Sequence, residues 1–104
     1  MKIMFWNVRG LGKAYRRSLV KSHVIQEELD VVAVQETIKT DFVDWELKEM
    51  AGNKDFVWYW IPAKGHSGDL LTGVKWETFE VEDSVLEEFY MAILVRHRST
   101  NVRY

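Results

Sequence analysis

The sequence predicts a single α/β domain with a mixed sheet and two helices. Three observations indicate this fold class. An apolar run, a segment of helical period and a second apolar run follow one another between residues 2 and 35, which is the order of a strand–helix–strand unit. More apolar runs of strand length come after a second helical segment. The 104 residues, 47% of them hydrophobic and only one of them proline, suffice for one compact core.

The first predicted strand is the apolar and aromatic run 3–8, which is bounded by Gly10 and Gly12. Because the run has no helical period, we expect a strand that is buried on both faces. Asn7 is its one polar side chain. A buried amide without partners costs about 1–3 kcal/mol, so Asn7 either caps the following turn or faces a cleft.

The first predicted helix covers residues 13–29, and a short β-branched strand, 31–34, follows it. One arc of the helix is apolar, and we expect it to face the core; it holds Tyr15, Leu19, Ile25 and Leu29. A helical crossover joins parallel strands, and such crossovers are right-handed. We therefore expect Asn7 and Glu36 to leave the sheet at the same edge, where α/β proteins hold their ligands.

The second predicted helix covers residues 41–51, with Thr40 or Asp41 as its N-cap and Gly52 as its C-terminal stop. Further strands are predicted at 55–61, 70–74, 78–82 and 89–96, and 63–69 has the composition of a loop. Together these strands indicate an antiparallel extension of the sheet. Residues 102–104 resemble the first residues of a returning strand, so we expect an incomplete domain.

Composition excludes several classes of protein. The chain has no cysteine, which excludes disulfides and thiolate metal sites. No apolar run approaches the roughly 20 residues of a membrane span, and none fits a signal peptide. The sequence thus predicts a soluble intracellular protein, nuclear or cytoplasmic, without contact to a membrane.

Charge is unevenly distributed along the chain, although the net charge is only −2. Residues 1–26 contain six basic and no acidic side chains, whereas 77–88 contain six acidic and no basic ones. The basic segment either meets a phosphate backbone or is a solvated face. Its cations are Lys2, Arg9, Lys13, Arg16, Arg17 and Lys21.

Asn7 and Glu36 offer one amide oxygen and one carboxylate. Mg²⁺ is usually bound by one or two carboxylates, water and substrate phosphate, so Glu36 is a plausible anchor for this ion. The three histidines, His23, His66 and His97, are scattered without the spacing of a zinc site.

The ordered motifs resemble the start of the endonuclease/exonuclease/phosphatase superfamily. The pattern W-N-x-R-G-L-G stands at 6–12, a basic helix follows, and the next strand ends in Q-E-T at 35–37. With the later Gly65-His66-Ser67-Gly68, the set is similar to endonuclease domains of plant non-LTR retrotransposons. These relatives usually have a second glycine at the position of Asp69. Degeneration after loss of selection is one explanation for this departure.

The resemblance implies a deoxyribonuclease-I-like, four-layered α/β sandwich, of which residues 1–104 form the N-terminal half. It also implies hydrolysis of phosphodiester or phosphomonoester bonds with Mg²⁺ or Mn²⁺. By their match to the motif, Glu36 is the metal-binding glutamate and Asn7 lies beside the metal and orients that carboxylate. Arg9, in the following loop, is expected to approach a phosphate.

Two function classes follow, together with a weaker third. The first is a Mg²⁺-dependent DNA endonuclease, but the family's catalytic tyrosine, its Asp-x-Asn pair and its Ser-Asp-His are not matched. The sequence contains no Asp-x-Asn and no Asp-His, so we expect little activity from this chain alone. The second is a non-catalytic remnant that binds DNA weakly through its basic segment, with Arg9, Lys13, Arg16 and Arg17 as contacts. The third is a protein-interaction module with an aromatic surface.

Overall fold

The computed structural model describes residues 1–63, 69–88 and 90–104. In these ranges the elements follow the predicted order, and no end lies more than four residues from its predicted position. They are β1 (Ile3–Asn7), α1 (Ala14–Gln26), β2 (Val31–Gln35), α2 (Asp44–Ala51), β3 (Phe56–Ile61), β4 (Leu70–Lys75), β5 (Phe79–Leu86) and β6 (Met91–His97). The predicted glycine motif 65–68 lies outside the described residues.

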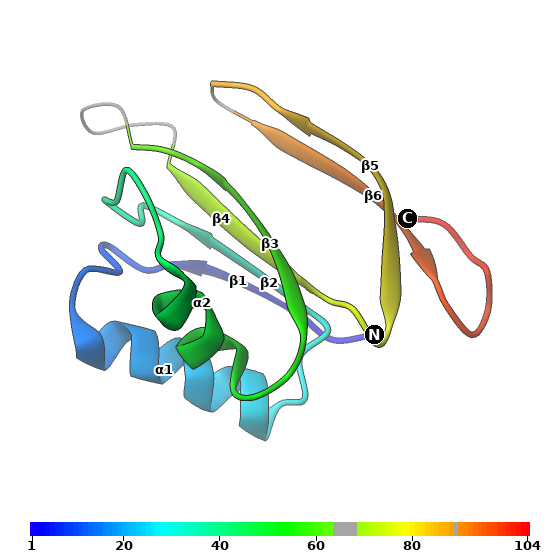
Figure 1. Ribbon diagram of the computed structural model, residues 1–104, viewed down its shortest axis with the longest axis horizontal. Helices are drawn as coiled ribbons and strands as arrows, with labels where there is room; N and C mark the ends of the chain where they lie inside the picture. Colours follow the sequence, from blue (N-terminus) through cyan, green and yellow to red (C-terminus); the bar gives the residue numbers. More distant parts are fainter. Residues whose placement is uncertain (64–68, 89) are drawn as a thin grey trace.

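Four strands form a mixed sheet in the order β1-β2-β4-β3 (Figure 1). β1 and β2 are parallel, as the strand–helix–strand pattern predicted, and β4 is antiparallel to both of its neighbours. β5 and β6 form a separate antiparallel pair, so the expectation that all later strands extend one sheet is wrong. Both sides of β4 are already occupied by β2 and β3, so β5, which follows β4 in the chain, cannot pair with it and pairs with β6 instead.

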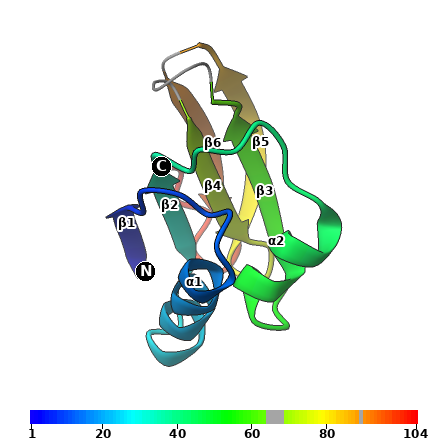
Figure 2. The same ribbon diagram turned by 90° about the vertical axis from the view of Figure 1, so that its left-hand side faces the viewer.

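The elements are stacked in three layers. Both helices lie on one face of the four-stranded sheet, and the β5–β6 pair lies on the other (Figures 1 and 2). Within the described residues these layers account for every helix and strand, so a fourth layer is not among them. No helix in this part of the chain is long and apolar enough to cross a membrane.

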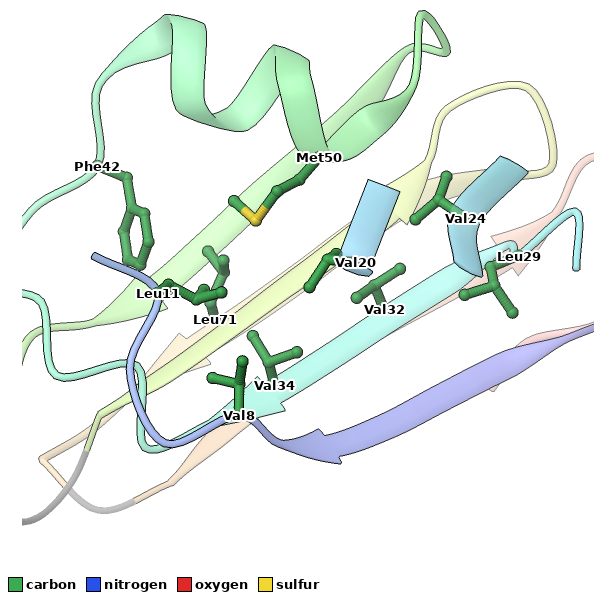
Figure 3. Close-up of a cluster of buried hydrophobic side chains, with 10 residues drawn as sticks. All are labelled: Val8, Leu11, Val20, Val24, Leu29, Val32, Val34, Phe42, Met50 and Leu71. Atoms are coloured by element: carbon green, nitrogen blue, oxygen red, sulfur yellow. The ribbon is translucent and has the colours of Figure 1, made fainter. Parts of the chain in front are cut away.

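The main core lies between the sheet and the two helices (Figure 3). Val32 and Val34 of β2 point into it with no more than 2% of their surface exposed. The alternate residues of β2 face the other side, where Val31 packs against a smaller cluster of Val74, Phe79 and Val95. This interior strand, which is apolar from Val31 to Val34, therefore contributes side chains to two cores.

β1 is not buried on both faces, which corrects the prediction. It is an edge strand, and its residues Ile3 and Phe5 are 40% and 80% exposed. Their partners across the parallel pair are Val31 and Ala33, so they share the face on which the β5–β6 pair packs. That pair packs over β4 and β2 through its small core and leaves the face of β1 open.

The buried face of α1 also differs from the prediction. Tyr15, Leu19 and Ile25 are 44–55% exposed, whereas Val20 and Val24 are buried. The stripe that faces the core is formed by Arg17, Val20 and Val24, which are spaced by three and four residues. The side chain of Arg17 makes ion pairs with α2, and these contacts select this face over the bulkier apolar arc.

α2 begins later than expected, and neither Thr40 nor Asp41 is its N-cap. The N-cap is Val43, whose backbone N–H donates to the Glu46 carboxylate at 3.1 Å. The helix ends at Gly52, as predicted, and Gly52 has the left-handed φ of 59° that glycine adopts without strain.

Residues 102–104 pair with β6, which confirms the returning segment. The His97 N–H donates to the Val102 carbonyl at 2.8 Å, and Val95 and Tyr104 exchange backbone hydrogen bonds of 3.2 and 2.9 Å. Between these bonds, Arg96 and Arg103 lie opposite each other in an antiparallel bridge.

Candidate functional site

The loops that follow β1 and β2 are joined by their backbones at one end of the sheet. Asn7 is the register partner of Gln35, the residue before Glu36. Beyond the strands, Gly10 N–H donates to the Glu36 carbonyl at 2.7 Å and Leu11 N–H to the Thr37 carbonyl at 2.8 Å. This pairing brings Asn7 and Glu36 to the same sheet edge, as the strand–helix–strand topology predicted.

Asn7 and Glu36 are both solvent-exposed at this edge. Glu36 has φ = 57°, a left-handed conformation that interrupts the side-chain alternation of β2 as the strand ends. Arg9 and Ile38, in the same two loops, are left-handed as well, each with φ = 53°. Left-handed backbone at non-glycine residues costs free energy and is concentrated at functional sites, so these loops are candidates for one.

A cleft of about 340 Å³ opens beside Asn7. The amides of Asn7 and Gln35 supply polar groups at its wall, and apolar side chains supply the rest. The apolar and hydroxyl lining residues include Phe5, Ala33, Leu70, Thr72 and Met91. Gln35 stands in the Q-E-T motif, but its place in the cleft follows from the strand register, which the sequence does not give.

Arg9 and Lys13 are exposed near this edge. Arg9 lies between Asn7 and Gly10, whose N–H binds the Glu36 carbonyl, and Lys13 is the N-cap residue of α1. Both positions are open to a ligand with phosphate groups.

Arg16 is bound to the loop itself. Its guanidinium donates to the Val8 carbonyl at 2.9 Å and to the Arg9 carbonyl. The Arg16 side chain thereby holds the loop that carries Arg9. A phosphate would have to compete with two carbonyl oxygens for the Arg16 guanidinium.

Arg17 is 6% exposed and points inward. Its guanidinium donates to the Leu11 and Gly12 carbonyls at 2.9 and 3.0 Å and pairs with Glu46 and Glu49 at 3.5 and 3.3 Å. Although predicted as a nucleic-acid contact, Arg17 ties the loop after β1 to α2 and is not presented at the surface.

Glu46 is a buried carboxylate that supports this arrangement from α2. Burial raises the pKa of Glu46, but the hydrogen bonds from Val43 N–H and Lys39 and the positive charges of Lys39 and Arg17 outweigh it and hold the pKa below its usual value. The carboxylate is therefore ionised at neutral pH and acts as the counter-ion of Arg17.

Asp69 is the residue just before β4 and lies 6% exposed beside the turn after β2. Its carbonyl accepts the Glu36 N–H at 3.1 Å, and its carboxylate Oδ2 accepts the Ile38 N–H at 2.7 Å. From the sequence, Asp69 could be recognised only as a residue that stands where relatives usually have glycine. Its partners depend on how β4 returns beside β2, which is a long-range contact.

Neither of the two histidines that the structure describes contacts Asn7 or Glu36. His23 is exposed on α1 with its ring centre 6.3 Å from that of Trp6. His97 stacks edge-on against Phe79, and its Nδ1 lies 3.0 Å from the Ser99 hydroxyl in its own turn. His66 lies outside the described residues.

The donor set at the edge consists of oxygen atoms, which suits a hard divalent cation. Glu36 offers a carboxylate and Asn7 an amide oxygen. Across residues 1–63, 69–88 and 90–104, no three His, Cys, Asp or Glu side chains gather as a complete metal site. The residues present therefore fit an ion that takes most of its ligands from water and substrate.

Comparison with known protein families found one that matches most of the chain. The model of the endonuclease/exonuclease/phosphatase family matches residues 4–102. The chain belongs to this family. A search of the curated proteins found no match. Members of the endonuclease/exonuclease/phosphatase family act as phosphodiesterases or nucleases, generally depend on a divalent metal and generally act on nucleic acids. The mixed sheet with two helices agrees with the fold of this family.

Proposed function

We propose that this chain supplies Asn7 and Glu36 to the divalent-metal site of a phosphodiesterase that acts on DNA. The observation that carries the proposal is the backbone pairing of the two loops, which holds both side chains at one exposed sheet edge. The resemblance to plant retrotransposon endonucleases supports DNA as substrate, and we propose that origin for the chain. The face-to-face packing of β5–β6 on the larger sheet supports a place in the N-terminal half of a four-layered sandwich.

Glu36 would bind the metal, and Asn7 would lie beside it and orient the carboxylate. Mg²⁺ or Mn²⁺ fits this oxygen donor set, and such an ion stabilises the negative charge that develops on phosphoryl oxygens. Arg9, exposed in the adjoining loop, would bind a neighbouring phosphate and so align the substrate.

We further propose that this chain alone hydrolyses DNA very slowly. The family's Asp-x-Asn and Asp-His sequences do not occur in it, and a general base contributes about 10²–10⁴-fold to the rate of such reactions. Supercoiled plasmid incubated with the protein and Mg²⁺ should remain unnicked. Nicking that disappears in Glu36→Ala would contradict slow hydrolysis while supporting the metal site.

Metal binding itself is tested by titrating Mn²⁺ into ¹⁵N-labelled protein. The paramagnetic ion should broaden the side-chain amide signals of Asn7 and Gln35 first, and Glu36→Gln should weaken the binding about tenfold or more because it removes the anionic ligand. Glu27→Gln, an exposed position at the far end of α1, is the matched control. Equal Mn²⁺ affinity in wild type and Glu36→Gln would exclude Glu36 as a ligand.

A second candidate function, weak nucleic-acid binding without hydrolysis, is supported by the exposure of Arg9 and Lys13 near the edge. Arg9→Ala should weaken binding of a fluorescent DNA oligonucleotide, and the affinity should fall steeply with salt because binding releases counter-ions. Lys54→Ala, exposed after α2, is the control. Binding that is insensitive to salt would rule out this mode.

A further inference from the structure

The turn after β2 is held in a conformation that its residues do not favour. Glu36 and Ile38 both have positive φ, at 57° and 53°. The left-handed region costs an L-residue roughly 1–2 kcal/mol, and a β-branched side chain such as that of Ile38 rarely enters it. Such a turn persists only where neighbouring groups hold it.

Asp69 provides two of the contacts that hold this turn. Its carbonyl accepts the N–H of Glu36 and its carboxylate accepts that of Ile38, so one residue binds both left-handed positions. Thr37, between them, is fully buried, and its carbonyl accepts the Leu11 N–H from the loop after β1. The N–H groups of Glu36 and Ile38 and the carbonyls of Glu36 and Thr37 thus have partners outside the turn.

Asp69 is suited to holding this turn because it is buried and its carboxylate accepts the Ile38 N–H. An acceptor that is ionised makes a stronger hydrogen bond than a neutral one, and here the bond of 2.7 Å spans 31 residues of sequence. A glycine at position 69, as in the relatives that the sequence resembles, would supply the carbonyl but not the carboxylate.

We propose that Asp69 is a positioning residue, which fixes the left-handed turn 36–38 so that the Glu36 carboxylate is presented to the metal. This inference rests on the proposed function, because it assumes that Glu36 binds a divalent cation. Asp69 acts through the turn and is not itself a ligand.

Two variants separate the hydrogen bond from the charge. Asp69→Asn keeps an oxygen that accepts the Ile38 N–H, whereas Asp69→Ala loses it, and both lose the same charge. Hydrogen exchange at the Ile38 amide, measured without metal, should be about tenfold faster in Asp69→Ala and close to wild type in Asp69→Asn. Exchange at the Val32 amide in β2 reports whether the sheet is intact.

The second readout is the affinity for Mn²⁺. We expect Asp69→Ala to weaken it about tenfold, as loss of an outer-shell contact does, and Asp69→Asn to stay within about threefold of wild type. Equal weakening in both variants would show that Asp69 acts by charge or as a ligand and would overturn the proposal. Should Asp69→Ala fail to fold, weak binding by a folded Asp69→Asn would overturn it equally.

The outcomes also separate this proposal from the proposed function. A wild-type protein that binds no Mn²⁺ would overturn the metal site and, with it, the role of Asp69. Wild-type protein that binds Mn²⁺ only as tightly as Asp69→Ala does, or an Ile38 amide whose exchange is unchanged in Asp69→Ala, would overturn the role of Asp69 alone.

Discussion

Arg17 is a basic residue that the fold uses internally. Its guanidinium joins the Leu11 and Gly12 carbonyls to Glu46 and Glu49 while the side chain is 6% exposed. Removal of one member of a buried ion pair leaves the other charge uncompensated, which costs about 3–5 kcal/mol. A basic side chain at an exposed position of the same helix contributes little to the free energy of unfolding.

Arg17→Met should therefore lower the free energy of unfolding by about 3 kcal/mol, measured by urea denaturation. Lys21→Met, at an exposed position one turn further along α1, should change it by less than about 0.5 kcal/mol. Equal losses in the two variants would contradict the contacts assigned to Arg17.

Gly73 in β4 is required because the Trp58 ring lies directly over it. A Cβ at this position would lie 2.5–2.8 Å from three atoms of that ring, whereas a Cβ at Gly12 would meet nothing within 4 Å. Gly73→Ala should lower the melting temperature, with a loss of about 1–3 kcal/mol from overpacking. Gly12→Ala is the matched control and should be nearly neutral, so a larger effect at Gly12 would contradict this packing.

Among the elements, the ends of the strands are tied by Asp30, which precedes β2. Its carboxylate accepts from the Lys2 N–H and the Thr78 hydroxyl and pairs with Lys75 at 3.3 Å. Burial raises the pKa of Asp30, but these hydrogen bonds and the Lys75 charge outweigh it and hold the pKa below its usual value. Asp30 thus joins the starts of β1 and β2 to the end of β4 and the turn before β5.

The pH dependence of stability follows from this lowered pKa. A carboxyl whose pKa is lower in the folded state stabilises the protein above its unfolded pKa, and this contribution is lost as pH falls through the folded value. The unfolding free energy should be constant near neutral pH and fall from about pH 4 downward. Asp30→Asn should flatten this fall, whereas the exposed control Glu27→Gln should not. An unchanged slope in Asp30→Asn would contradict the assignment.

The order of the elements and the shared edge of Asn7 and Glu36 could be predicted because they depend on local patterns and on the parallel strand–helix–strand unit. The buried face of α1 could not, because apolar residues lie on both sides of it and the deciding contacts come from α2. The same holds for Asp69 and Gln35, whose places follow from strand pairing across tens of residues. The features that the sequence could not predict depend on long-range pairing of strands and helices and not on local propensity.

At the scale of the whole molecule, the two sheets leave an apolar groove of about 330 Å³ that runs along the edge strand β1. Phe5, 80% exposed, and Ile3 stand at its open side. An apolar edge strand is a site at which chains associate, because the backbone groups on its free side and its exposed apolar side chains lack partners in the sheet.

Wild-type protein should therefore self-associate, with a sedimentation coefficient that rises with concentration. Phe5→Lys should reduce this rise, because a charge on an edge strand opposes association. Leu19→Lys, which adds the same charge on the exposed side of α1, is the control and should leave association unchanged. Equal effects of the two variants would attribute association to net charge instead of β1.

The backbone pairing of the loops after β1 and β2 restricts how this family member can vary in length. Beyond the ends of the strands, Gly10 and Leu11 donate to the carbonyls of Glu36 and Thr37, one residue out of the register of β1 and β2. A residue added between Asn7 and Leu11, or between Gln35 and Thr37, would move these donors away from their acceptors, whereas a substitution that keeps the backbone would not. We therefore expect insertions or deletions in these two short segments to disturb the paired loops more than changes of side chain do.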